Sequence, residues 1–187
     1  SDVCSSDLGT LSLHVERLPA RQSRRGVMVL LAGGPGQAGT PVSADDPVAA
    51  AIPGWDYVMF DQRGTGKAAL RCAALDSPSS AQTPKDIGQC ASQVGPRRAF
   101  YATRDSVLDI EDLRAGLGAE SFALGGVSYG TYVAQYYATL FPSSLDHLVL
   151  DSVVNPSQMD GIDLQSDQSM PTVLTGLCAL GNCAGIT

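Results

Sequence analysis

Short apolar runs alternate with segments of helical period along most of the chain. Turn residues flank each run, and the run at 11–15 alternates apolar and polar positions, as an edge strand does. Strands joined by crossover helices form a mostly parallel sheet with helices on its faces, so the pattern predicts an α/β fold. The predicted strands cover residues 11–15, 27–32, 57–61, 122–127 and 145–151.

Two predicted helices flank the strand at 122–127. The first places apolar residues on one face over 107–117, and Thr103 is a candidate N-cap for it. The second covers 129–140 and ends at Pro142, because proline cannot continue a helix. We expect both helices to connect neighbouring strands of the sheet.

Two segments depart from this alternation. Residues 70–98 are rich in Ser, Pro, Gln and Gly, which predicts a long loop. After Asp151 the residues become polar, and a short helix is expected at 172–180. We therefore expect three parts: a non-native or adaptor-derived tail at 1–9, the N-terminal part of the α/β core at 10–155, and the start of a cap or lid insertion at 156–187.

The composition is that of a globular protein, with 187 residues, 44% of them hydrophobic and 17% charged. The net charge of -7 leaves no basic surface for a phosphate backbone, so a nucleic-acid partner is not expected. The most apolar run, at 27–32, is far shorter than the roughly 18 residues that a membrane span requires. We expect neither a nucleic-acid partner nor a membrane span.

A G-x-S-x-G motif occupies residues 126–130, between a predicted buried strand and a predicted helix. A tight turn at this point pushes the hydroxyl of Ser128 outward, and the small glycines let neighbouring backbone pass close to it. The start of the following helix favours negative charge nearby. This context favours an α/β-hydrolase fold with Ser128 as its nucleophile over a serine in an ordinary glycine turn.

A glycine-rich turn at 33–36 follows the predicted strand at 27–32, where an α/β-hydrolase supplies half of its oxyanion hole. The donor must be a backbone N–H, which Pro35 lacks, so Gly33, Gly34 or Gly36 must provide it. We favour Gly34, paired with the N–H of Tyr129. The alternative is a turn that only reverses the chain.

No cofactor is expected. Gly34, Gly36 and Gly39 match G-x-G-x-x-G, but Pro35, Pro41, Pro47 and Pro53 leave no long helix for a pyrophosphate. A P-loop match at 61–68 fails at its first glycine and at its Ser or Thr position. No C-x-x-C spacing occurs, and the two histidines lie far from the cysteine pairs in sequence, so no metal site is expected.

The segment D-Q-R-G-T-G at 61–66 ends the predicted strand at 57–61. Its charged side chains are expected near the carboxyl edge of the sheet. We expect a buried Asp61–Arg63 network that shapes the region around Ser128 rather than direct participation in bond making.

Together, GGPG at 33–36, DQRGTG at 61–66 and GVSYG at 126–130 resemble proline iminopeptidase-like α/β-hydrolases of peptidase family S33. The resemblance extends over roughly residues 10–187 and is greatest with the exported tripeptidyl aminopeptidases. It implies a serine exopeptidase that releases residues from a free peptide N-terminus, with a helical cap inserted after the sixth strand. Many relatives have His before GGPG, where this chain has Ala32.

The family orders its catalytic triad as Ser, acid and His. His147 begins a strand and is expected at the amino edge, away from Ser128, while His14 belongs to the first hairpin. Asp151 ends the same strand as His147, whereas the family's acid comes one strand later. We expect these three residues to be structural, so the chain should end before the last strands and be inactive by itself.

Four cysteines form two local pairs, Cys72 with Cys90 and Cys178 with Cys183. We interpret them as disulfides rather than as four unrelated thiols, which predicts a secreted or periplasmic protein. The resemblance agrees, because relatives commonly have cysteines after DQRGTG and in the later insertion. Residues 1–8 lack the basic start and apolar core of a signal peptide.

Three functions remain open at this point. The first is an exported aminopeptidase that cleaves peptides through an acyl-enzyme. The second is a carboxylic ester hydrolase acting on small esters or amides, because the strand, turn and helix around Ser128, here called the elbow, can serve both kinds of bond. The third is a noncatalytic binding module on the same scaffold. The sequence does not indicate an oligomeric state.

Overall fold

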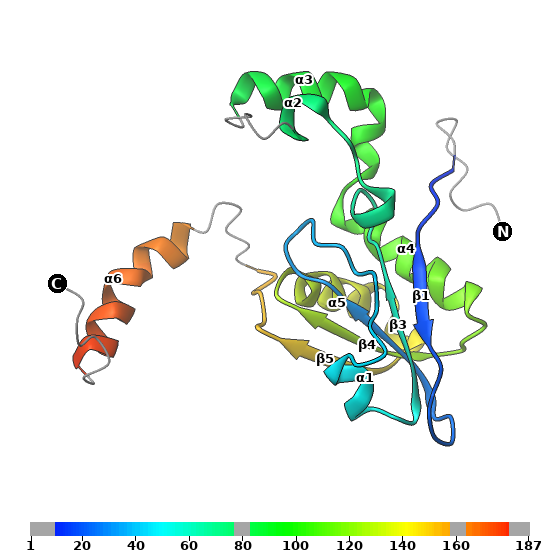
Figure 1. The fold of residues 1–187 in the computed structure, drawn as a ribbon. Helices are drawn as coiled ribbons and strands as arrows, with labels where there is room; N and C mark the ends of the chain where they lie inside the picture. Colours follow the sequence, from blue (N-terminus) through cyan, green and yellow to red (C-terminus); the bar gives the residue numbers. More distant parts are fainter. Residues whose placement is uncertain (1–9, 77–82, 158–163, 180–187) are drawn as a thin grey trace. The chain divides into compact units, whose positions relative to one another are not determined.

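The computed structural model describes residues 10–76, 83–157 and 164–179 (Figure 1). The chain divides into two compact units, Ser1–Val154 and Asn155–Thr187. The first contains the sheet, and the second contains helix α6 (Leu164–Ala179). The tail predicted at 1–9 lies outside the described residues.

The described strands of the first unit form one sheet in the order β1-β3-β2-β4-β5. Strand β2 pairs in parallel with β3 and β4, and β4 pairs in parallel with β5, whereas β1 is antiparallel to β3. The predicted mostly parallel sheet is confirmed. The strands are β1 (Val15–Leu18), β2 (Gly26–Leu31), β3 (Trp55–Phe60), β4 (Phe122–Val127) and β5 (Leu145–Asp151).

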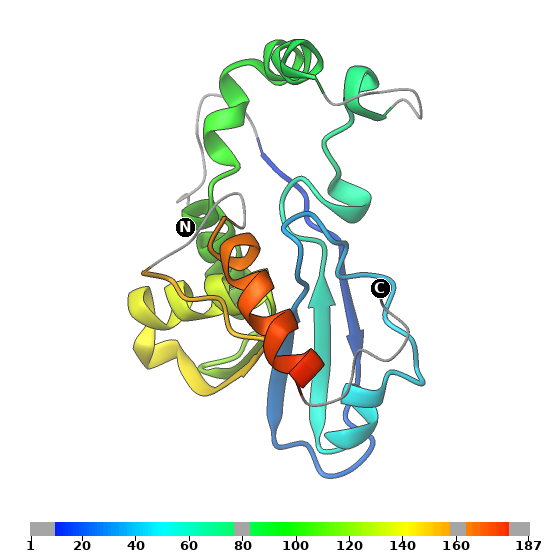
Figure 2. The same cartoon turned by 90° about the vertical axis from the view of Figure 1, so that its left-hand side faces the viewer.

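Because β2 to β5 run in the same direction, their C-terminal ends share one border, here called the carboxyl edge, and their N-terminal ends share the amino edge. Helix α1 (Pro47–Ala51) lies beside the amino edge, and the segment after β3 rises above the carboxyl edge (Figure 2). That segment contains α2 (Ala73–Asp76), α3 (Pro84–Val94) and the 3₁₀ turns η1 (Gly66–Ala68) and η2 (Gly95–Phe100).

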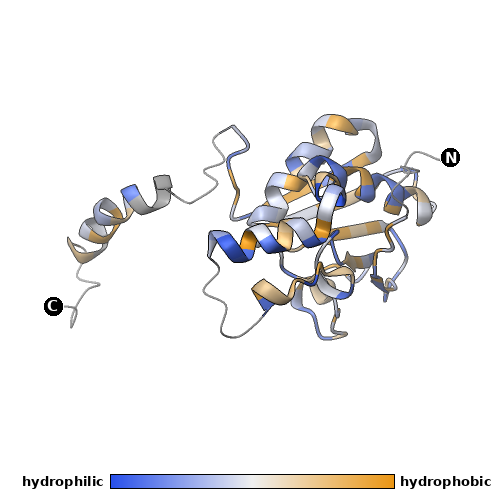
Figure 3. Cartoon of the chain, turned by 90° about the horizontal axis from the view of Figure 1, so that it is seen from above, coloured by the Kyte–Doolittle hydropathy of each residue, from blue (hydrophilic) through white to orange (hydrophobic). Residues whose placement is uncertain are grey.

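Each face of the sheet has its own hydrophobic core. One face packs against α4 (Thr103–Gly116) and α5 (Tyr129–Leu140), which is followed by the turn η3 (Pro142–Ser144). The other face packs against α1 through a smaller cluster that includes Met28 and Tyr57. The strands are accordingly mostly hydrophobic, and hydrophilic positions lie on the outer helices (Figure 3). Successive side chains of β2 point to opposite faces of the sheet, so this strand contributes residues to both cores.

The strands predicted at 27–32 and 57–61 are shifted by one or two residues, to Gly26–Leu31 and Trp55–Phe60, and two other predicted boundaries are wrong. The first strand covers Val15–Leu18 instead of 11–15, because its bounds follow backbone pairing with β3, where Val15 lies opposite Phe60. Helix α4 starts at Thr103 instead of being capped by it. Its first turn is held by Asp105, whose carboxylate accepts a hydrogen bond from the Ala102 N–H at 3.1 Å.

The long loop predicted at 70–98 is also wrong, because α2, α3 and η2 occupy much of it. Helix α3 begins with a capping box: the Thr83 N–H donates to the Asp86 carboxylate at 3.0 Å, and the Asp86 N–H donates to the Thr83 hydroxyl at 3.3 Å. Pro84 suits the first turn of a helix. These start signals outweigh the polar composition on which the loop prediction depended.

Helix α6 spans Leu164–Ala179, so it begins earlier than the helix expected at 172–180. Pro171 lies inside it, although proline is normally disfavoured within a helix. Over the described ranges, no helix combines the length and the apolar character that crossing a membrane requires.

Candidate active site

Ser128 lies on a tight turn between β4 and α5, with φ 52° and ψ −118°. Positive φ is uncommon for any residue other than glycine, so this backbone is strained. The flanking glycines make the turn possible: a Cβ at Gly126 would lie 2.4 Å from the Gly130 backbone, and one at Gly130 would lie 2.5 Å from the Leu31 carbonyl oxygen. The predicted strand, turn and helix are therefore present at the motif.

The turn is held by β5 and by the first residues of α5. The Ser128 N–H donates to the Asp151 carbonyl at 3.0 Å, and the Thr131 hydroxyl donates to the Ser128 carbonyl at 2.6 Å. The Val154 N–H donates in turn to the Thr131 hydroxyl oxygen at 2.8 Å. Asp151 thus supports the elbow through its backbone, while its carboxylate accepts the Ser152 hydroxyl at 3.0 Å.

The segment at 33–40, here called the glycine loop, approaches Ser128 through Gly33. A Cβ at Gly33 would lie 3.3 Å from the Ser128 Cβ and 3.2 Å from the Gln37 Oε1. Gly34 and Gly36 have φ values of 108° and 104°, and the Gly34–Pro35 peptide bond is cis. The loop therefore lies beside the serine, and Gly33 is the glycine packed against it.

Asp61 does not form the predicted network with Arg63. Its side chain is fully buried and accepts hydrogen bonds from the N–H groups of Gly39, Thr40 and Lys67 at 2.8 to 3.0 Å. Burial acts to raise the pKa of this carboxyl, but these hydrogen bonds outweigh it and hold the pKa below its ordinary value. The prediction failed because backbone N–H groups, which sequence patterns do not reveal, satisfy the carboxylate.

Arg63 pairs instead with Asp109 on α4. Its guanidinium donates to the two carboxylate oxygens at 2.7 and 2.5 Å and also to the Phe100 carbonyl oxygen. Burial raises the pKa of Asp109, and Arg63 opposes that shift. This ion pair ties the end of β3 to α4 and η2, so it shapes the rim of the carboxyl edge.

Tyr129, the residue after Ser128, also contacts α4. Its hydroxyl and the Thr103 hydroxyl are 2.9 Å apart. Thr103 was expected to cap α4, and its link to the elbow had no signal in the local sequence. The contact orients the Tyr129 side chain, while the Tyr129 backbone begins α5.

The two histidines lie on different edges. His147 belongs to β5 opposite Ala123, near the amino edge, and its ring packs edge-on against Trp55 at 5.8 Å. His14 precedes β1 near the carboxyl edge, where its Nε2 is 2.9 Å from Glu16 Oε1 and 2.8 Å from Lys67 Nζ. Across the described part of the chain, no hydrogen bond joins either histidine to Ser128.

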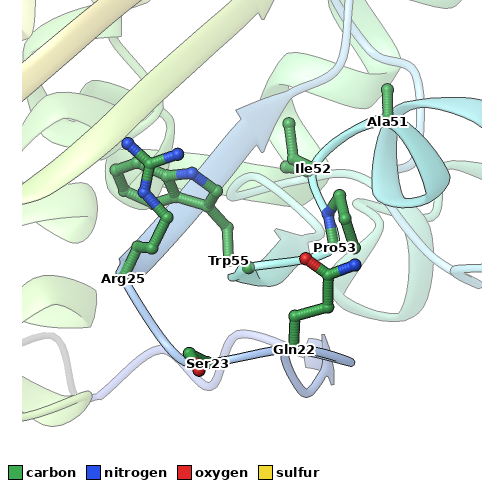
Figure 4. A pocket seen from close by; sticks show the side chains of 8 residues that line it. Gln22, Ser23, Arg25, Ala51, Ile52, Pro53 and Trp55 are labelled. Atoms are coloured by element: carbon green, nitrogen blue, oxygen red, sulfur yellow. The ribbon is translucent and has the colours of Figure 1, made fainter.

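The cavity in Figure 4 lies at the amino edge, opposite Ser128. It has a volume of about 380 Å³, and the Arg25 guanidinium lies over the Trp55 ring at 5.8 Å. It therefore does not belong to the elbow. The lining residues are Gln22, Ser23, Arg25, Ala51, Ile52, Pro53, Gly54 and Trp55. Among the described His, Cys, Asp and Glu residues, no group of three is arranged to hold a metal ion.

Cys72 and Cys90 are neighbouring free thiols in this structure. A hydrogen bond between the two side chains, together with burial, raises the pKa of Cys90 to about 11. Gln93 of α3 donates to the Arg71 carbonyl at 2.7 Å, which keeps the two segments together. The predicted disulfide is therefore not formed here, although its partners meet. The other predicted pair includes Cys183, which lies outside the described residues.

Comparison with known proteins identifies the family. The alpha/beta hydrolase fold family matches residues 26–181, and the chain belongs to it. Tripeptidyl aminopeptidase of Streptomyces coelicolor is 30% identical over 175 residues, 79% of this chain and 32% of that protein. Serine protease Hip1 of Mycobacterium tuberculosis is 27% identical over 172 residues, 78% of this chain and 33% of that protein. The chain thus spans about a third of the length of these curated relatives.

A solved structure agrees on the fold. Proline iminopeptidase of Mycobacterium smegmatis superimposes with a TM-score of 0.50 and 22% identity, covering 73% of this chain and 38% of that one. The resemblance predicted from the three motifs is therefore confirmed: the chain is an alpha/beta hydrolase with relatives named as aminopeptidases.

Proposed function

We propose that the full-length protein is a serine hydrolase in which the Ser128 hydroxyl attacks a carbonyl carbon and forms an acyl-enzyme. The observation that carries the proposal is the strained turn at Ser128, which faces the glycine loop at Gly33. Strain of this kind persists where the surrounding structure holds it, and it is common at nucleophiles.

The oxyanion that develops on the carbonyl would be held by backbone N–H groups. The Tyr129 N–H lies in the first turn of α5, where backbone N–H groups have no partner within the helix, so it suits this role. Gly34 is the second donor that we propose, and the contact of Gly33 with Ser128 brings the start of the same loop to the nucleophile. Removing one such donor typically costs about 100- to 1,000-fold in kcat.

A general base is also needed, because the serine hydroxyl is a poor nucleophile while it keeps its proton. Neither His14 nor His147 contacts Ser128, and Asp151 bonds to Ser152. We therefore assign the base and its acid to parts of the full-length protein outside the described residues. The 187-residue chain alone is expected to be inactive.

The proposed substrate is a peptide with a free α-amine, and the reaction is release of residues from that end. The peptidase names of the relatives support this choice, and a carboxylic ester hydrolase and a noncatalytic binding module are the rivals. Full-length protein should cleave peptide arylamides, and Ser128→Ala should abolish cleavage. Hydrolysis of esters alone favours the esterase, unchanged cleavage after blocking the α-amine excludes the aminopeptidase, and no hydrolysis favours the binding module.

We also propose that the full-length protein is exported and that Cys72 and Cys90 become oxidised to a disulfide. Each thiol would lose one proton and one electron to a disulfide-exchange oxidant, and the adjacent side chains support this pairing. Nonreducing peptide mapping of protein isolated from its native host should find the two cysteines linked. Two alkylatable thiols, in protein recovered from the cytosol, would refute both ideas.

A further inference from the structure

Two consecutive residues at the end of β3, Asp61 and Gln62, contact opposite ends of the glycine loop. Asp61 is fully buried and Gln62 is 6% exposed, so both side chains act inside the protein. Neither has a place in the proposed attack of Ser128 on its substrate. Their hydrogen bonds show what they do to the loop.

Asp61 holds the C-terminal end of the loop. Its Oδ1 accepts the Gly39 N–H at 3.0 Å and the Thr40 N–H at 2.9 Å, and the Thr40 hydroxyl lies 3.1 Å from both carboxylate oxygens. Its Oδ2 accepts the Lys67 N–H at 2.8 Å. One carboxylate therefore joins the glycine loop to the turn after β3.

Gln62 holds the N-terminal end of the same loop. Its Nε2 donates to the carbonyl of Ala32 at 3.4 Å, directly before Gly33. The same carbonyl faces the elbow, because a Cβ at Gly130 would lie 2.9 Å from it. The Gln62 backbone is fixed in turn, since its carbonyl accepts the Thr65 N–H at 2.9 Å and the Thr65 hydroxyl at 2.8 Å.

The packing around Asp61 leaves its carboxylate little freedom. A Cβ at Gly66 would lie 2.1 Å from the Asp61 Cγ, and Gly66 itself has a φ of 52°. A Cβ at Gly39 would lie 2.1 Å from the Phe60 carbonyl oxygen. Glycines on both sides thus allow the loop and the turn to close around one side chain.

We propose that Asp61 and Gln62 are positioning residues that hold both ends of the glycine loop, so that its N–H groups face the oxyanion formed at Ser128. The inference rests on the proposed function and adds to it the residues that pre-organise the site. Oxyanion donors are effective only when they are already aimed at the developing charge. A misplacement of about 1 Å can cost about 100-fold in rate.

Asp61→Asn is the main variant, because it keeps the size of the side chain and replaces one acceptor oxygen with an NH₂ donor. The asparagine cannot accept from Gly39, Thr40 and Lys67 together: with its oxygen on the Gly39 and Thr40 N–H groups, its NH₂ opposes the Lys67 N–H, so the glycine loop should lose its tie to the turn after β3. In full-length enzyme, kcat on a peptide arylamide should fall about 100-fold, while KM changes less than about threefold.

Asp56→Asn is the matched control. Asp56 is a buried carboxylate on β3, the strand that Asp61 directly follows, but it lies at the amino edge and bonds to Arg17, Arg24 and the Ala20 N–H. Both variants should lose thermal stability, because both break buried hydrogen bonds. After correction for the folded fraction, Asp56→Asn should keep the kcat of the parent enzyme.

A peptide boronic acid separates positioning from loss of folded protein, because its tetrahedral adduct places an oxygen where the oxyanion forms. The affinity is measured per titrated active site. Asp61→Asn should lower the affinity for the boronic acid by about the same factor as it lowers kcat/KM, and it should leave the affinity for a ground-state peptide inhibitor unchanged. Gln62→Leu, a second variant in case Asp61→Asn does not fold, should show the same pattern at about tenfold.

The positioning role would be overturned if Asp61→Asn and Asp56→Asn had equal kcat and equal boronate affinity per active site. If Asp61→Asn does not fold, the same conclusion would follow from a kcat and a boronate affinity of Gln62→Leu that equal those of the parent enzyme. Ser128→Ala tells this result apart from failure of the proposed function. If Ser128→Ala is inactive while Asp61→Asn is unimpaired, only the positioning role is wrong. If Ser128→Ala keeps full activity, the proposed function is wrong, and the positioning role falls with it.

Discussion

Asp56, in β3, and Asp61, directly after β3, are both buried, and the two carboxylates differ in which groups donate hydrogen bonds to them. At the amino edge, Asp56 is bonded mainly by Arg17 and Arg24, whose side chains are 45% and 55% exposed. At the carboxyl edge, Asp61 is bonded by backbone N–H groups and one threonine hydroxyl. The cost of burying each carboxylate is therefore offset mainly by exposed arginine side chains at the amino edge and by main-chain N–H groups at the carboxyl edge.

This difference has a consequence for function. Long exposed side chains can adjust while the backbone near them moves, so Asp56 holds the main chain directly at only one N–H, that of Ala20, whereas Asp61 holds three. Backbone donors transmit the position of Asp61 directly to the glycine loop. The carboxyl edge, which holds Ser128, is therefore the edge where small displacements should change activity, and the amino edge is where they should change only stability.

The largest effect is expected at Ser128, the proposed nucleophile. Ser128→Ala in the full-length enzyme should lower kcat by about 10⁴-fold or more, because the covalent route is lost. Thermal stability should stay equal or rise, since the strained serine contributes no hydrogen bond from its side chain among the described residues. Steady-state kinetics measures the loss of kcat, and thermal unfolding measures the stability. Residual activity above about one per cent of the parent enzyme, more than contamination would explain, would count against the serine mechanism.

A glycine pair probes the packing around Asp61. Gly66→Ala should lose about 3 kcal/mol of unfolding free energy, because its Cβ would meet the Asp61 carboxylate at a strained φ. Gly118→Ala has a similar φ of 66° with no atom within 4 Å of its Cβ, so it should lose only about 1 kcal/mol. Urea unfolding measures both, and equal losses would show that the contact with Asp61 does not matter.

Acid titration compares carboxylates that shift in opposite directions. The pKa of Asp61 is lowered, so its contribution to stability is present above its unfolded pKa of about 4 and is lost as pH falls below that value. The pKa of Asp109 is raised, so stability that it contributes at low pH is lost as pH rises through its folded pKa. As pH falls from 6 to 3, the free energy of unfolding should therefore decrease less steeply in Asp61→Asn than in the parent protein, and more steeply in Asp109→Asn. Urea unfolding at several pH values measures both slopes, and slopes changed in the opposite directions would contradict the prediction.

The smallest effect is expected at the cavity of the amino edge. Arg25→Ala removes an exposed guanidinium from the Trp55 ring, which should cost about 0.5 to 1 kcal/mol of unfolding free energy. Activity should not change, because this cavity lies on the edge opposite Ser128. A fall in kcat/KM beyond about twofold would place the cavity in the substrate path.

The elements that contain the site were predictable because their signals are local. In the sequence, Ser128 lies between an apolar run and a segment whose apolar residues repeat with the spacing of a helix, and the glycines at 126 and 130 mark the turn. Contacts between distant segments were not predictable in this way. Asp61 was assigned to Arg63, its neighbour in sequence, although its partners at 39 and 40 are set by how two loops fold together. The same limit hid the contact between Thr103 and Tyr129.

The most direct test is a crystal structure of the full-length enzyme with a peptide boronic acid bound to Ser128. The predicted adduct has one boronate oxygen within hydrogen-bond distance of the Tyr129 N–H and of an N–H at 33–36. An adduct on another residue, or a boronate oxygen that faces solvent while those N–H groups point elsewhere, would contradict the assignment of this edge as the catalytic one.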